Sequence, residues 1–143
     1  MVIRGSYCLC IRVKDDIKVN VGALGVITFP NGLYIYVGSA LNSLMPRLSR
    51  HLKTNKGQGK AIHWHIDYIL RRPEVEVEGI YITVRAIRME CELASKVAER
   101  GVSVPRFGCS DCSCPSHLYR VDDFGFLAKI GLEKIDLDEL TSS

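Results

Sequence analysis

The sequence predicts an α+β fold: a small antiparallel or mixed sheet with about three flanking helices. Segments rich in β-forming residues come first and are joined by turn signals. Segments with helical periodicity follow, interrupted by one further strand. The chain has 143 residues, 47% of them hydrophobic, which suits one folded domain. We expect this domain to span residues 1–132, with an acidic C-terminal tail over 133–143.

The N-terminal part predicts three strands in succession. Residues 6–14 are rich in β-formers, residues 17–29 are a second extended stretch, and residues 33–38 are strongly apolar. A hairpin signal, Pro30-Asn31-Gly32, precedes the third strand. Short turns between successive strands indicate an antiparallel meander.

Two helices and a strand come next. Residues 43–54 carry a leucine every four positions, as the buried stripe of a helix does, and a basic loop follows. Residues 61–72 have helical character until Pro73. Residues 74–84 alternate acidic and apolar side chains before turning apolar, as in a half-buried strand.

A third helix is predicted over residues 87–100, and it contains Glu90. Apolar residues lie three, four and seven positions after Glu90, so Glu90 shares the inward face, whereas Glu92 points outward. A carboxylate on a buried face needs a cation, a metal or several hydrogen bonds. The alternative is a rim position near the helix start, where acids suit the helix dipole.

Residues 119–132 are expected to form a short strand or helix.

Positive charge concentrates in one segment. Between residues 47 and 72 the only acid is Asp67, whereas the net charge of the chain is just +3. The seven basic residues of this segment are Arg47, Arg50, Lys53, Lys56, Lys60, Arg71 and Arg72. Such a patch favours a polyanionic partner, nucleic acid first, although a solvated helix face would have the same composition.

Two further groups of side chains could bind metal. His63, His65 and Asp67 have a spacing that permits a metal site or a His–Asp hydrogen bond, the alternative being an aromatic cluster. A second segment contains four soft ligands within nine residues, and it could bind zinc or form a tightly turned loop. These ligands are Cys109, Cys112, Cys114 and His117. The sequence shows no secretion signal and no membrane-spanning apolar run, so we expect a cytoplasmic protein with reduced thiols.

Together these residues resemble the GIY-YIG nuclease superfamily over roughly residues 5–120. Gly5-Ser6-Tyr7 and Tyr36-Val37-Gly38 match its two tripeptides. Arg47 and His51 match the arginine and histidine of the next helix. Glu90-Cys91-Glu92-Leu93-Ala94 matches the segment around its metal-binding glutamate.

The resemblance implies an endonuclease that hydrolyses DNA phosphodiesters with Mg²⁺ or Mn²⁺. Glu90 would hold the metal, and Tyr7 or Tyr36 would take the proton of the attacking water. Arg47 would lower the pKa of the tyrosine and stabilise negative charge, with His51 relaying the proton or orienting the water. The other basic residues of the segment would follow the phosphate backbone.

Two longer sequence segments resemble those of a divergent branch of that superfamily. HWHIDY and FGCSDCSCPSHL are typical of members that are sometimes fused to endonuclease III-like repair domains. This resemblance implies a role in DNA repair with a possible repair-protein partner. Two alternatives remain open: a non-catalytic DNA-binding module with a degenerate site, and a zinc-stabilised interaction domain.

One departure from the superfamily is an insertion. Tyr7 and Tyr36 lie 29 positions apart, whereas a short hairpin usually joins the two tripeptides. We expect an inserted strand at about residues 17–29 to fill this gap.

Overall fold

A computed structural model describes residues 5–40, 44–57, 62, 64–83, 90–108 and 116–137. It confirms the α+β fold. The main sheet has six strands in the order β6-β7-β4-β1-β5-β8, and all of its neighbouring pairs are antiparallel. Its strands are β1 (Gly5–Val13), β4 (Gly32–Ala40), β5 (Val75–Thr83), β6 (Gly101–Ser103), β7 (Leu118–Val121) and β8 (Glu133–Ile135).

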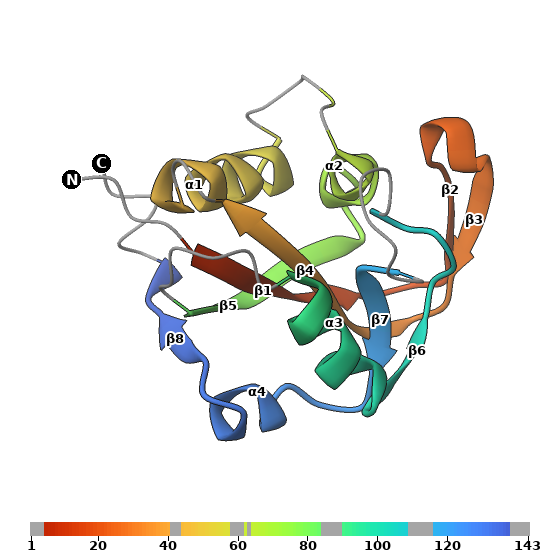
Figure 1. Cartoon of the computed structure of the whole chain (residues 1–143). Helices are drawn as coiled ribbons and strands as arrows, with labels where there is room; N and C mark the ends of the chain where they lie inside the picture. Colours follow the sequence, from red (N-terminus) through yellow and green to blue (C-terminus); the bar gives the residue numbers. More distant parts are fainter. Residues whose placement is uncertain are drawn as a thin grey trace.

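The expected three-strand meander is wrong in one respect. Strand β1 pairs directly with β4, and the chain between them forms a separate two-stranded sheet of β2 (Ile17–Asn20) and β3 (Val26–Phe29). A short 3-10 helix, η1 (Gly22–Leu24), turns the chain between these two strands. The insertion is therefore a hairpin beside the main sheet rather than a strand within it (Figure 1).

Helices cover both faces of the main sheet (Figure 1). Helices α1 (Leu44–Asn55) and α2 (His65–Leu70) lie on one face, and α3 (Glu90–Ala98) and α4 (Phe126–Lys129) lie on the other. The alternation of strand side chains explains the two layers. Tyr7 of β1 packs in the core beneath α1 and α2, whereas its neighbour Cys8 packs beneath α3 and α4.

The C-terminal elements extend further than expected. Strand β8 lies within the segment expected to be a tail, and it pairs with β5 through residue 135. The segment 119–132 contains both a strand, β7, and the short helix α4. Among the described residues, no helix is long and apolar enough to span a membrane.

Candidate functional site

A buried tyrosine–histidine pair joins the sheet to helix α1. The hydroxyl of Tyr7 on β1 lies 2.9 Å from Nε2 of His51 on α1. Tyr7 is 2% exposed and His51 is fully buried. The two rings are tilted at 51° with their centroids 5.5 Å apart. The structure thus brings together two residues that lie 44 positions apart in the sequence.

Gly38 makes room for the Tyr7 ring. Tyr7 pairs with Gly38 across the β1–β4 ladder. A Cβ atom at Gly38 would lie 2.5 Å from both Cζ and the hydroxyl oxygen of Tyr7, far inside van der Waals contact. The glycine of the second tripeptide therefore positions the tyrosine of the first.

The His51 imidazole is held neutral. Burial, and then the positive charges of Arg47 and Arg50, lower its pKa to about 3. A neutral imidazole carries one proton and offers one acceptor nitrogen, so Nε2 can accept a hydrogen bond from the Tyr7 hydroxyl. Within the described part of the chain, the buried Nδ1 atom of His51 has no hydrogen-bond partner.

Tyr36 also packs against the His51 ring. Its ring meets His51 edge-on at 6.4 Å and Phe107 at 6.3 Å, and Tyr36 is 6% exposed. The predicted residues Tyr7, Tyr36 and His51 are therefore gathered on one face of the sheet.

Two arginines of α1 stack on Trp64. The guanidinium carbons of Arg47 and Arg50 lie 4.5 Å and 4.9 Å from the centre of the Trp64 ring, and that ring lies 5.6 Å from His51. Arg47 also donates a hydrogen bond to the carbonyl oxygen of Ser39, at 3.1 Å. These contacts hold two fixed positive charges beside the Tyr7–His51 pair.

Glu90 is the first residue of α3, on the face of the sheet opposite α1. The predicted inward positions of this helix, Leu93, Ala94 and Val97, are buried, and Glu92 is exposed. The expected orientation of the helix is therefore confirmed. The side chain of Glu90 lies outside the described part of the chain, so its role as a metal ligand stays a prediction.

His65 and Asp67 of the HWHIDY segment both make hydrogen bonds to the backbone. Nδ1 of His65 accepts a hydrogen bond from the backbone N–H of Gly108, at 2.8 Å, and burial lowers the pKa of His65. Asp67 is buried, and its carboxylate accepts the backbone N–H of Trp64 at the start of α2. This is the geometry of a helix cap. His63 lies outside the described residues.

The proposed zinc ligands are only partly described. His117 is buried just before β7, whereas Cys109, Cys112 and Cys114 lie outside the described residues. No group of three or more potential ligand side chains gathers among the residues that the structure describes. Cys91 is disulfide-bonded, which corrects the expectation of reduced thiols at this position, whereas Cys8 and Cys10 are free thiols as expected.

The other basic residues of the segment differ in exposure and in pairing. Lys53, Lys56 and Arg71 are exposed. Arg72 is paired with Glu74 at 3.2 Å, which reduces its availability to a phosphate. Lys60 lies outside the described part of the chain.

Sequence reasoning missed the roles of Trp64 and Asn55. Arg47 and Arg50 stack on Trp64, and no spacing pattern in the sequence predicts this contact. The side-chain amide of Asn55 donates to the carbonyl oxygens of Leu70 and Val75, at 2.9 and 2.8 Å, and so ties the end of α1 to α2 and β5. The sequence signal for Asn55 is its position at the end of a predicted helix, where asparagine is favoured.

The fold and these contacts define an α+β domain with a buried Tyr–His pair beside a Trp–Arg cluster. A family model described as "Domain of unknown function DUF123" matches residues 6–135. The chain belongs to this family. No curated protein and no solved structure matches the chain.

Proposed function

We propose that this chain is a metal-dependent endonuclease of the GIY-YIG type that hydrolyses phosphodiester bonds of DNA. The observation that carries the proposal is the buried Tyr7–His51 hydrogen bond beside the charges of Arg47 and Arg50. Phosphodiester hydrolysis needs a proton acceptor for water and positive charge for the phosphate, and this cluster offers both.

The proton acceptor is the Tyr7–His51 pair. Tyr7 takes a proton from the attacking water and passes its own to Nε2 of His51. His51 is a weak base because burial, and then the charges of Arg47 and Arg50, lower its pKa. A phosphodiester bound at Arg47 and Arg50 would offset their charge, so substrate binding itself would raise the basicity of His51.

Arg47 and Arg50 bind the phosphate. A guanidinium donates paired hydrogen bonds to phosphate oxygens, and these bonds strengthen as negative charge develops. Stacking on Trp64 fixes both side chains before the substrate arrives, which lowers the entropic cost of binding.

Glu90 is the proposed metal ligand on the resemblance alone, because α3 packs on the face of the sheet opposite the Tyr7–His51 pair. Mg²⁺ retains several waters and needs only one or two protein carboxylates, so one glutamate is an adequate donor set. When bound, the metal polarises the scissile phosphate and stabilises the leaving oxygen. The same proposal includes a role in DNA repair and a repair-protein partner, which rest on the resemblance of the HWHIDY and FGCSDCSCPSHL segments. It also includes a cytoplasmic location.

The test is a cleavage assay on supercoiled, single-stranded and branched DNA with Mg²⁺ or Mn²⁺. Wild type is compared with Glu90→Gln and with the matched variant Glu92→Gln, whose side chain is exposed on the same helix. We expect cutting by wild type and by Glu92→Gln, and none by Glu90→Gln or in EDTA. Cutting that survives Glu90→Gln would overturn the assignment of the metal site.

A non-catalytic DNA-binding module is the second candidate. The observation in its favour is the burial of both Tyr7 and His51, which leaves the Trp64–arginine cluster as the accessible part. This candidate predicts salt-dependent DNA binding with no cutting under any metal condition.

A further inference from the structure

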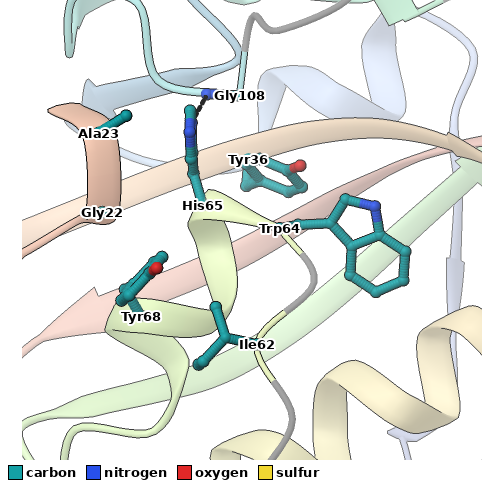
Figure 2. A pocket seen from close by; sticks show the side chains of 8 residues that line it. All are labelled: Gly22, Ala23, Tyr36, Ile62, Trp64, His65, Tyr68 and Gly108. Carbon is teal, nitrogen blue, oxygen red and sulfur yellow. Dashed lines mark hydrogen bonds between the residues drawn. The ribbon is translucent and has the colours of Figure 1, made fainter.

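A pocket of about 230 Å³ opens beside the Tyr7–His51 pair. Its walls come from four places in the fold: the η1 turn between β2 and β3, strand β4, the segment that leads into α2 together with α2 itself, and the turn at Gly108. Figure 2 shows Gly22 and Ala23 on one side, His65 and Tyr68 of α2 beside them, and Tyr36 between His65 and Trp64. The inserted hairpin thus supplies one wall of a pocket that includes a proposed catalytic tyrosine.

Three large aromatic rings line this pocket. Tyr36, Trp64 and Tyr68 line it, and the last two are half-buried, so part of each ring faces open space. Pockets for drug-sized molecules usually measure roughly 300–1,000 Å³. A smaller aromatic pocket suits one planar ring system, because flat heteroaromatic rings stack on aromatic side chains.

Two glycines bring backbone close to these rings. Gly22 and Gly108 have φ values of 53° and 77°, which favour glycine. A Cβ atom would lie 2.9 Å from the hydroxyl oxygen of Tyr68 at Gly22, and 3.3 Å from Cε1 of Tyr36 at Gly108. Any larger residue at either position would crowd a ring that lines the pocket.

The hydrogen bonding of His65 determines which of its ring nitrogens is a donor. Its Nδ1 atom accepts the backbone N–H of Gly108, so in the neutral ring the proton lies on Nε2. The pocket wall therefore combines aromatic surface with a polar group able to contact the edge of a ring.

Positive charge surrounds the same rings. Arg47 and Arg50 lie over Trp64, and Arg71 lies 5.7 Å from the centre of the Tyr68 ring. A ligand that matches both features has a planar heteroaromatic ring with phosphates close to it. A nucleotide within a strand has this chemistry, with the base in the pocket and its phosphates at the arginines.

Building on the proposed nuclease function, we propose that this pocket receives one unstacked base of the DNA substrate. The substrate class is then single-stranded DNA, or duplex DNA with an unpaired nucleotide, rather than continuous duplex. A paired base would first have to leave the helical stack, at a cost that an unpaired base does not incur.

The test measures binding rather than cleavage, in EDTA, by fluorescence anisotropy. The probes are a short single strand, its duplex, and the same duplex with one bulged nucleotide. Ala23→Phe fills the pocket from an exposed position, and Ala23→Ser is the matched control. A stacked base contributes about 5- to 150-fold in affinity, so wild type should prefer the unpaired probes by a factor in this range.

We expect Ala23→Phe to abolish this preference without changing duplex affinity, and Ala23→Ser to retain it. Tyr68→Leu and Tyr68→Phe form a second pair, of which the phenylalanine variant keeps the stacking ring. Circular dichroism checks the folding of each variant.

Equal affinity of wild type for all probes, or a preference that survives both Ala23→Phe and Tyr68→Leu, would overturn the pocket assignment and leave the nuclease proposal standing. Absence of any DNA binding would overturn both, and a matched RNA strand bound more tightly would overturn the assignment to DNA. A preference that Ala23→Phe removes, in a protein that cuts nothing, would support the pocket and contradict the nuclease.

Discussion

The Tyr7 hydroxyl and Nε2 of His51 lie 2.9 Å apart inside the core, linking the central strand β1 to helix α1. A buried hydrogen bond between two titratable side chains specifies more than packing, because either partner left alone would be unsatisfied. The stability of the protein, the dependence of that stability on pH and the proposed proton transfer all involve this contact.

Acid should destabilise the protein through His51. The pKa of His51 is lowered to about 3 in the folded state, whereas an unfolded histidine has a pKa of about 6.5. Below pH 6.5 the unfolded chain therefore binds a proton that the folded chain does not, and stability falls as the pH falls. Between pH 7 and pH 5 this single group should cost about 2 kcal/mol.

Urea unfolding at both pH values checks this effect, with His51→Gln as the comparison. The variant should lose less stability than wild type between pH 7 and pH 5, because glutamine does not titrate. Equal losses in the two proteins would mean that His51 is not held neutral.

Gly38→Ala should displace Tyr7. The added Cβ atom would lie 2.5 Å from the Tyr7 ring and hydroxyl, and overpacking of this kind costs about 1–3 kcal/mol. We expect lower stability in urea together with loss of DNA cleavage.

Gly79→Ala is the matched control, in strand β5 on the other side of β1. There the added Cβ atom would meet Cε of Lys134 at 3.5 Å, an ordinary contact. It should keep wild-type cleavage and stability. Two variants that behave alike would refute the positioning role of Gly38.

Arg50→Ala should weaken DNA binding and its dependence on salt. Each phosphate contact contributes about 0.7–0.9 to the slope of log affinity against log salt concentration. Losing the Arg50 contact should therefore reduce that slope by nearly one unit. Lys129→Ala, on α4 across the sheet, should leave the slope unchanged. A salt titration of DNA affinity makes the comparison, and equal slopes for Arg50→Ala and wild type would remove Arg50 from the phosphate site.

The sequence predicted the α+β fold because apolar periodicity reports directly on buried faces. Glu92 was placed correctly on the outward side of α3 on this basis, since Leu93, Ala94 and Val97 mark its inward side. The hairpin β2–β3 could not be distinguished from a sheet strand, because short extended segments look alike whichever partner they pair with.

The candidate site was predictable only in part. The resemblance brought Tyr7, Tyr36, Arg47 and His51 together, whereas no local pattern shows that Trp64 would lie beneath two arginines of another helix. Such contacts depend on the crossing of α1 and α2, which tertiary packing decides.

The most direct measurement is DNA cleavage by Tyr7→Phe beside Tyr34→Phe. Both changes remove one hydroxyl from a buried tyrosine of the same sheet. The hydroxyl of Tyr34 donates a hydrogen bond to the carbonyl oxygen of Pro30, at 2.7 Å. We predict that Tyr7→Phe lowers the cleavage rate by at least about 100-fold, the usual contribution of a proton-transfer group, while Tyr34→Phe stays near the wild-type rate. Wild-type cleavage by Tyr7→Phe would contradict the proposal that the Tyr7–His51 pair carries the proton.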